Sequence, residues 1–344
     1  MPLDEPGWWY ARDGHPLAYL LAPLGLVYGA LARRRHQTGA AFRSRLPVVC
    51  IGNFTAGGTG KTPLTLHLAR TLAARGHQPV VLTRGYGGKL SGPYWVDADT
   101  DTAEMVGDEA LLLAAASRTL LARDRVAGAK AIDTGPHPAT VVLMDDGMQN
   151  PSLEKDLVIA VVDGQRGFGN GRVIPAGPLR APLPFQMELV DVIVVNEPAG
   201  GDGRVAEALR REFTGPVLRA STAAIGDTAW LREGPLLAWA GIGNPGRFFD
   251  LLTGLGGDVR IRRPFPDHHP LSEPEAGELL QAAEASGTRL VTTAKDLARL
   301  KGRSGAPRAL AEASRVLEVG LTLAASEAER LEEIVLSALA APRT

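Results

Sequence analysis

The sequence predicts an α/β protein in which helices cover both faces of a mostly parallel sheet, followed by a smaller second block of strands and helices. Three observations support this prediction. Short apolar runs alternate with helical stretches from residue 47 onward, a glycine-rich loop joins the first run to the first helix, and the pattern starts again near Pro235. The length of 344 residues also suits two domains better than one.

The elements of the first block follow from apolar runs bounded by turn residues. The helix Lys61–Ala74 follows the first of five predicted strands, which cover residues 47–51, 79–82, 140–144, 157–162 and 192–195. The second block is predicted to contain strands at Leu236–Ala240 and Arg289–Thr293, a helix at 245–255 and further helices towards the C-terminus. Residues 219–233 are less apolar and form the predicted linker.

Composition excludes several classes of protein. Lys and Arg total 37 against 38 for Asp and Glu, so the chain lacks the basic excess of a general nucleic-acid binder, and no nucleic-acid partner is expected. The single cysteine, Cys50, rules out an internal disulfide and a cysteine-rich zinc site, and favours a reducing compartment.

The N-terminal region contains an uncharged run at residues 16–32. Trp8, Trp9 and Tyr10 precede it, and three arginines, 33–35, follow it. A helix of this length rises roughly 26 Å, slightly less than a spanning helix needs, and Pro23 weakens it further. One interpretation is a buried core helix. The other is a helix at or partly within the bilayer surface, because aromatic and basic flanks suit that interface.

A secretory signal peptide fits this N-terminus poorly. The residues before the apolar run carry Asp4, Glu5 and Asp13 against Arg12, whereas a signal peptide begins with a positive segment.

The glycine-rich loop is a variant of the phosphate-binding P-loop. Gly60, Lys61 and Thr62 match the end of that pattern, and Thr55 replaces its first glycine. Backbone N–H groups of such a loop bind phosphate oxygens, Lys61 would reach the β- and γ-phosphates, and the Thr62 hydroxyl would bind Mg²⁺. We therefore predict ATP and Mg²⁺ as ligands, with the ATP-binding residues Thr55, Ala56, Gly57, Gly58, Thr59, Gly60, Lys61 and Thr62.

Two aspartates end a predicted strand of the same sheet. Asp145 and Asp146 follow four apolar residues, which places their carboxylates at the carboxyl edge where ligands bind in parallel sheets. Either could hold Mg²⁺ directly or through water. Glu109, beside Asp108 at the start of a predicted helix, is a third candidate ligand.

Further segments carry arginines in glycine-rich frames. Arg84 closely follows the predicted strand 79–82, and Arg166, Arg172 and Arg180 lie in a long loop over residues 163–180. Arginine forks bind phosphate oxygens well, so this loop predicts a phosphorylated substrate. Long structureless loops in compact domains usually have a function.

Taken together, the motifs resemble the tetraacyldisaccharide 4'-kinase family of lipid A biosynthesis. They are GNFTAGGTGKTP, LTRGYGG, VGDE, DDGMQN, DGQRGFGNGRVIPAGPLR, FPDHH and TTAKD, and they begin at residues 52, 82, 106, 145, 163, 265 and 292. The resemblance implies transfer of the ATP γ-phosphate to the 4'-hydroxyl of a lipid disaccharide 1-phosphate at the cytoplasmic face of the bacterial inner membrane. It implies no protein partner.

The resemblance also implies an architecture and roles for residues. The expected ranges are an N-terminal membrane-associated helix (1–40), a P-loop α/β/α kinase domain (41–218), and a linker with a smaller α/β/α lid domain (219–344). Asp108 and His268 match the family's pair near the acceptor hydroxyl and, with Lys61, are the expected catalytic residues; His269 is the runner-up. The expected substrate-binding residues are Arg84, Gln149, Asn150, Arg166, Asn170, Arg172 and Arg180.

Two positions depart from the family pattern. Asn150 stands where many relatives have His, so proton transfer there is doubtful, although an amide can still hydrogen-bond. Ala294 stands where a Glu often occurs, while Lys295 and Asp296 are kept.

Two other activities stay open at this stage. One is a P-loop kinase or ligase acting on a soluble acceptor. The other is a membrane-associated P-loop NTPase without a lipid acceptor, for which the carboxylates 108–109 and the segment 267–269 would have no use.

Overall fold

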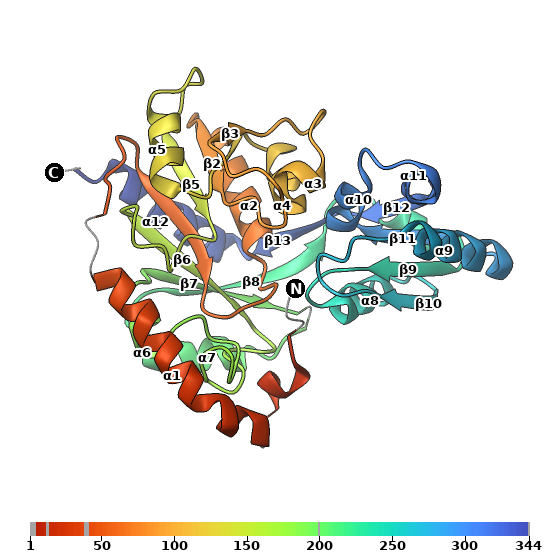
Figure 1. The fold of residues 1–344 in the computed structure, drawn as a ribbon, viewed down its shortest axis with the longest axis horizontal. Coiled ribbons are helices and arrows are strands. Elements are labelled where there is room, and N and C mark those ends of the chain that lie inside the picture. The colour runs from red at the N-terminus through yellow and green to blue at the C-terminus, as the bar shows by residue number, and fades with distance from the viewer. Residues whose placement is uncertain (1–4, 12–13, 38–40, 199, 343–344) are drawn as a thin grey trace.

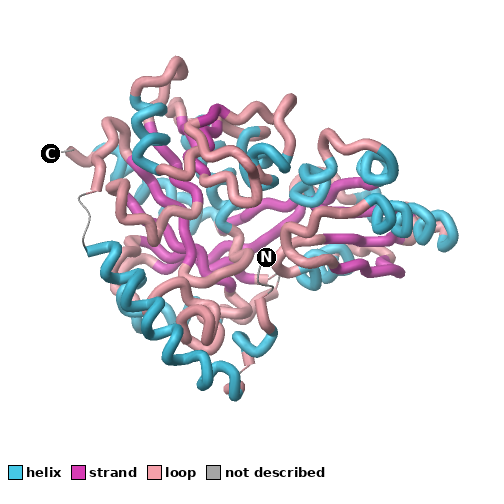
Figure 2. The backbone as a smooth tube through the Cα atoms, viewed as in Figure 1, coloured by secondary structure: helices cyan, strands magenta, loops and turns pink. Residues whose placement is uncertain are grey.

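The computed structural model describes residues 5–11, 14–37, 41–198 and 200–342 of the chain. Asp4, Arg12, Asp13 and the predicted boundary at residue 40 lie outside these ranges. Two separate sheets organise the fold, and Figure 1 shows the larger one on the left and the smaller one on the right. Helices lie on both sides of each sheet (Figure 2), so the predicted α/β class with mostly parallel strands is confirmed.

The larger sheet has nine strands in the order β13-β8-β7-β6-β1-β5-β2-β4-β3. Its pairings are parallel, except that β8 with β13 and β3 with β4 are antiparallel. The strands are β1 (Val48–Asn53), β2 (Pro79–Thr83), β3 (Tyr94–Trp95), β4 (Thr119–Leu121), β5 (Val141–Asp145), β6 (Leu157–Asp163), β7 (Val192–Glu197), β8 (Val217–Ala224) and β13 (Val319–Leu323).

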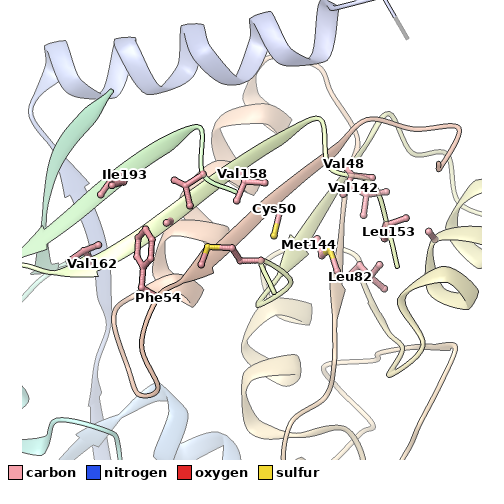
Figure 3. Close-up of a cluster of buried hydrophobic side chains, with 14 of the residues drawn as sticks. Val48, Cys50, Phe54, Leu82, Val142, Met144, Leu153, Val158, Val162 and Ile193 are labelled. Atoms are coloured by element: carbon pink, nitrogen blue, oxygen red, sulfur yellow. The ribbon is translucent and has the colours of Figure 1, made fainter. Parts of the chain in front are cut away.

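The central strands are apolar on both sides because helices bury both faces of this sheet. Val48 and Cys50 of β1 belong to the core on one face, shown in Figure 3, and Val49 and Ile51 to the core on the other. The first face is covered by α5 (Arg125–Asp133), α6 (Leu183–Met187) and α7 (Arg204–Glu212). The second is covered by α2 (Lys61–Ala74), α4 (Asp108–Ala114) and α12 (Ala325–Ala340), and α3 (Ala103–Val106) precedes α4.

The smaller sheet has four parallel strands in the order β10-β9-β11-β12. They are β9 (Leu236–Ala240), β10 (Val259–Pro264), β11 (Arg289–Thr293) and β12 (Ser314–Leu317). One face packs on η2 (Ala229–Arg232) and α8 (Pro245–Gly254), and the other on α9 (Glu273–Ser286), α10 (Ala294–Leu300) and α11 (Gly305–Ala313). The smaller domain is thus a second α/β/α sandwich.

The chain crosses between the sandwiches twice, through an antiparallel strand pair. β8 leaves the larger sheet, and β13 returns to it and pairs with β8. Ala224 and Val319, at the far ends of this pair, pack against the core of the smaller domain. Two elements within the predicted lid range 219–344, β13 and α12, therefore belong to the larger sandwich, a return that no single apolar run in the sequence indicates.

The apolar N-terminal run forms α1 (Pro16–Gln37), preceded by η1 (Gly7–Tyr10). One side of α1 rests on the larger domain: a Cβ on Gly25 would lie 2.7 Å from the Val173 carbonyl oxygen, and one on Gly29 would lie 3.0 Å from Pro182. Only 17% of its most apolar window is buried, although the helix is long and apolar enough to cross a membrane. The exposed side carries Leu17, Tyr19, Leu20, Leu24, Leu26, Val27, Tyr28 and Leu31.

Candidate active site

A cleft of about 1990 Å³ lies between the two domains. The loop between β1 and α2 lines it on one side, and the loop after β10 and the start of α10 line it on the other. This volume exceeds the ~300–1,000 Å³ of a pocket for one small ligand, so it has room for two reactants.

The P-loop is held in shape by its neighbours. Gly60 has φ +102° and immediately precedes α2, and the Asn196 side chain donates to the Thr59 carbonyl oxygen at 3.0 Å. The Ala56 N–H donates to the Pro178 carbonyl oxygen at 2.8 Å, and Asn53 Nδ2 to the Gly57 carbonyl oxygen at 3.3 Å. The loop and the first turn of α2, residues 56–62, line the cleft, as the sequence predicts for a phosphate cradle.

The two aspartates at the carboxyl end of β5, Asp145 and Asp146, have different surroundings. Asp145 is buried and accepts a hydrogen bond from Thr65 Oγ1 at 3.2 Å; its burial and the nearby charges of Glu109 and Asp146 raise its pKa. Asp146 faces the cleft in a left-handed conformation, with φ +53°. Burial opposes its ionisation, but the charges of Arg180 and Lys61 prevail and lower its pKa.

Lys61, Asp146 and Arg180 form one ion cluster at the mouth of the P-loop. Lys61 Nζ lies 3.7 Å and Arg180 Nη1 lies 2.6 Å from the same oxygen, Asp146 Oδ1. Arg180 also donates to the Thr55 carbonyl oxygen at 3.1 Å. Two cations beside the loop suit the transferring phosphates of a nucleotide.

Asp108 and His268 come from different domains and meet at the wall of the cleft, which His268 lines. Asp108 opens α4 and is only 4% exposed, while His268 follows β10. His268 Nδ1 lies 3.0 Å from Asp108 Oδ2, and the His268 backbone is left-handed with φ +59°. The Tyr86 ring lies 5.1 Å from the imidazole. The predicted pair is therefore in hydrogen-bonding contact.

Two cations of α10 complete this cluster. Arg299 Nε donates to Asp108 Oδ2 at 2.6 Å, and Lys295 Nζ lies 3.2 Å from Glu109 Oε1 and 3.3 Å from His268 Nε2. Burial alone would raise the pKa of Asp108. The hydrogen bond from His268 and the charges of Lys295 and Arg299 outweigh burial and lower that pKa, so Asp108 stays ionised.

His269, the runner-up in the sequence, lies in a different environment. Its Nε2 lies 2.8 Å from Glu275 Oε1, within the capping box that starts α9, and its ring stacks on Phe265. It is not among the described residues that line the cleft.

The remaining arginines of the loop 163–180 contact the N-terminal region. Arg166 lines the cleft and donates to Glu5 Oε2 at 2.9 Å, with its guanidinium over the Tyr10 ring. The Arg172 guanidinium lies 4.5 Å from the centre of the Tyr19 ring in α1. The arginine loop thus ties the N-terminal segment to the nucleotide side of the cleft.

Other predicted substrate residues make contacts within the larger domain. Gln149 donates to the Asn53 carbonyl oxygen and to Gln186, Asn150 accepts from the Ser152 N–H and hydroxyl, and Asn170 donates to the Ala176 carbonyl oxygen. Among the described residues, the lining of the cleft includes none of Arg84, Gln149, Asn150, Asn170 and Arg172.

The carboxylates near the P-loop have the chemistry of Mg²⁺ ligands. In the described part of the chain no group of three or more His, Cys, Asp or Glu side chains is arranged to hold a metal ion alone. Mg²⁺ beside a nucleotide usually takes only one or two protein carboxylates, because phosphate oxygens and water supply the rest. The oxygens of Thr62, Asp146 and Glu109 all line the cleft, and Asp145 lies behind Asp146, so the donor set fits.

Three contributors to the site were not found by sequence reasoning. They are Arg299, Asn196 and Arg247, whose Nη2 donates to the Glu197 carbonyl oxygen at 2.8 Å and whose Nη1 lies 3.4 Å from Asp163 Oδ2. Each links segments distant in sequence: Arg247 of α8 reaches across the domain boundary to β6 and β7. The available signals were weak: Arg299 comes three residues after Asp296, and Asn196 directly follows a predicted strand.

Comparisons with known proteins agree with this geometry. The family profile described as tetraacyldisaccharide-1-P 4'-kinase matches residues 17–340. Tetraacyldisaccharide 4'-kinase of Rhodopseudomonas palustris (strain BisB18) is 46% identical over 99% of this chain and 97% of its own length. That of Methylobacterium radiotolerans is 47% identical over 99% of this chain and 100% of its own.

A solved structure is also similar over nearly the whole chain. The crystal structure of LpxK from Aquifex aeolicus in complex with ATP superposes with a TM-score of 0.73 at 25% identity, covering 94% of this chain and 99% of that one. The relatives that match this chain over nearly its whole length are tetraacyldisaccharide 4'-kinases, and the chain has the two sandwiches, the P-loop and the Asp108–His268 cluster described above. The chain belongs to the tetraacyldisaccharide-1-P 4'-kinase family.

Proposed function

We propose that this protein binds ATP in the P-loop and transfers its γ-phosphate to the 4'-hydroxyl of a tetraacyldisaccharide 1-phosphate, a step of lipid A biosynthesis. One observation carries the proposal. The phosphate cradle with Lys61 and the imidazole of His268 line the same cleft between two domains, and Asp108 contacts that imidazole from behind the cleft wall. A phosphate donor and an acid–base pair for a hydroxyl acceptor are the two halves of a kinase site.

His268 is the proposed general base. Its Nδ1 faces the Asp108 carboxylate, so Nε2 is the nitrogen that can take a proton from the acceptor hydroxyl. As that O–H bond breaks, the oxygen forms a bond to the γ-phosphorus, the bond from the γ-phosphorus to the β,γ-bridging oxygen breaks, and ADP leaves. Lys295 Nζ lies 3.3 Å from His268 Nε2. In the substrate complex, the acceptor hydroxyl would replace the Lys295 ammonium beside this nitrogen.

The phosphates would be held by the nucleotide side of the cleft. Residues 57–61 and Arg180 line this region, so backbone N–H groups of the loop, the Lys61 ammonium and the Arg180 guanidinium would bind phosphate oxygens there. Thr62, Asp145, Asp146 and Glu109 would hold Mg²⁺. When bound, Mg²⁺ neutralises charge on the β- and γ-phosphate oxygens.

The smaller domain would act as a lid. His268, Lys295 and Arg299 all belong to it, and each contacts a carboxylate of α4 in the larger domain. The base is therefore in place only when the lid is closed. Closure also excludes the water that would otherwise hydrolyse ATP.

We place the protein on the cytoplasmic surface of the inner membrane, anchored by α1. Gly25 and Gly29 face the larger domain and the opposite side of α1 is apolar, which supports a helix lying along the protein in the membrane interface. Arg33, Arg34 and Arg35 at its end suit anionic headgroups.

The test is transfer of labelled phosphate. Purified protein would be incubated with [γ-³²P]ATP, Mg²⁺ and tetraacyldisaccharide 1-phosphate in detergent micelles, and the products separated by thin-layer chromatography. We expect label on the lipid. Label released only as inorganic phosphate would instead support a membrane-associated NTPase. Label on a water-soluble sugar phosphate, with none on the lipid, would support a kinase of soluble acceptors.

A further inference from the structure

We propose that Arg299 is a positioning residue for phosphoryl transfer, which fixes both Asp108 and the loop that carries His268. The inference rests on the proposed function and assigns a role in it to a residue that the sequence motifs do not single out.

The first contact is with the carboxylate. Asp108 Oδ2 accepts from His268 Nδ1 at 3.0 Å and from Arg299 Nε at 2.6 Å, while Oδ1 lies 2.8 Å from the Glu109 backbone nitrogen. Both oxygens are therefore engaged. In this arrangement Asp108 orients His268 and is not itself free to accept the hydroxyl proton.

The second contact is with the backbone beside His268. Arg299 Nη1 donates to the Gly241 carbonyl oxygen at 2.6 Å, and the same oxygen accepts the His268 N–H at 3.2 Å. The His268 backbone is left-handed, a conformation that costs free energy in a residue with a Cβ and therefore needs support from its surroundings. One guanidinium thus reaches both members of the pair.

The guanidinium is itself held in place by Asp296. Asp296 Oδ1 accepts from Arg299 Nη1 at 2.7 Å and from the Gly241 N–H at 2.9 Å, and Asp296 Oδ2 accepts from the Thr293 hydroxyl at 2.6 Å. Only 10% of the Arg299 side chain is exposed. Thr293 and Asp296 are the second Thr and the Asp of the TTAKD motif. These hydrogen bonds therefore give the motif a structural role, which is to hold the Arg299 guanidinium.

Arg299 lies in the lid and Asp108 in the larger domain, so this contact forms only on closure. A planar fork is needed, because Nε and Nη1 serve different acceptors at fixed angles. Lysine can supply one of these hydrogen bonds but cannot match the fork.

The experiment compares Arg299→Gln and Arg299→Lys with the wild type in the lipid assay, measuring kcat, the KM for ATP and thermal unfolding. We expect Arg299→Gln to lower kcat by about 10²-fold, the scale of a small misplacement of reacting groups. The KM for ATP should stay close to the wild-type value, because Arg299 is not among the described residues that line the cleft. Arg299→Lys should have an intermediate kcat.

The matched control is Arg308→Gln. Arg308 is exposed on α11 of the same domain and pairs with Glu312, so its kcat should equal that of the wild type. A double variant, Asp108→Asn with Arg299→Gln, tests the route of action. If Arg299 acts through Asp108, the double variant loses little more than Asp108→Asn alone.

Two outcomes would overturn the proposal: a folded Arg299→Gln protein with wild-type kcat, or losses that multiply fully in the double variant. Should Arg299→Gln not fold, Arg299→Lys decides, because wild-type kcat in that variant also contradicts a role for the fork. A wild type that phosphorylates no lipid would refute the proposed function instead. The His268 Nδ1–H resonance in proton NMR, assigned by its loss in His268→Gln, would then still report whether Arg299→Gln disturbs the pair.

Discussion

His268 and Asp108 are 160 positions apart in the sequence, yet His268 Nδ1 lies 3.0 Å from Asp108 Oδ2 across the domain boundary. The contact joins a lid loop to the first residue of α4. Because the imidazole presents Nδ1 to the carboxylate, its tautomer and orientation are set before substrate arrives. In the proposed mechanism, catalysis is thereby coupled to the angle between the two sandwiches.

Replacing His268 by Gln should lower kcat by roughly 10²-fold or more, the usual scale for acid–base groups. Glutamine keeps a hydrogen bond to Asp108 but cannot take a proton, so the KM for ATP should change little. Steady-state lipid phosphorylation at saturating substrates measures this.

His269→Gln is the matched control, because that imidazole contacts Glu275 and stacks on Phe265 but is not among the described residues that line the cleft. Its kcat should stay close to that of the wild type. If His269→Gln lost activity while His268→Gln kept it, the base would have to be reassigned to His269.

Replacing Lys61 by Ala should abolish transfer. The Lys61 ammonium lies 3.7 Å from Asp146 at the mouth of the P-loop, and its loss removes charge neutralisation and positioning of the phosphates together. Label transfer and equilibrium binding of ATP measure the two effects. Lys89→Ala, which removes an exposed lysine paired with Glu104, should be neutral. Near-normal turnover by Lys61→Ala would refute the P-loop assignment.

Placing two glutamates on the exposed side of α1, as Leu20→Glu with Leu24→Glu, should release the protein from membranes. These leucines are 73% and 58% exposed and lie one turn apart, so the change charges the apolar surface without touching Gly25 or Gly29. Flotation with vesicles containing anionic lipid, at low salt, measures binding.

The control adds the same charge to an exposed helix of the lid, as Gln281→Glu with Ala285→Glu in α9. That protein should still float with the vesicles. Equal binding by the α1 variant and the wild type would show that this surface does not hold the protein at the membrane.

Local sequence patterns predicted most of the strands and helices, because a strand or a loop is indicated by the residue types within a few consecutive positions. The strand before the P-loop was predicted at 47–51 and observed at Val48–Asn53, and the helix Lys61–Ala74 was predicted with the observed bounds. The apolar run at 16–32 likewise became α1, observed as Pro16–Gln37.

What the sequence could not indicate are contacts between segments far apart in the chain. The return of β13 to β8 depends on a pairing about 100 residues away, and Arg299 reaches Asp108 across 191 positions. Arginine spacing likewise favoured a phosphate site in the loop 163–180, whereas the contacts of Arg166 and Arg172 depend on where the N-terminal segment folds. Their assignment to substrate stays a prediction.

A final prediction concerns the backbone of the P-loop itself, where Gly60→Ala and Gly58→Ala should differ sharply. Gly60 has φ +102°, and a Cβ there would lie 2.5 Å from Asn196 Nδ2, the atom that donates to the Thr59 carbonyl oxygen. The left-handed backbone alone costs about 1–2 kcal/mol for a residue with a Cβ. The Asn196 side chain must also move, so the loop loses one of its hydrogen bonds.

Gly58 does not have a positive φ, and a Cβ there would meet nothing within 4 Å. Gly60→Ala should therefore lower both the unfolding temperature and the affinity for ATP, whereas Gly58→Ala should leave the unfolding temperature unchanged. Differential scanning fluorimetry with and without ATP measures both quantities in one experiment. Equal behaviour of the two variants would mean that Asn196 and the left-handed turn do not set the shape of the phosphate cradle.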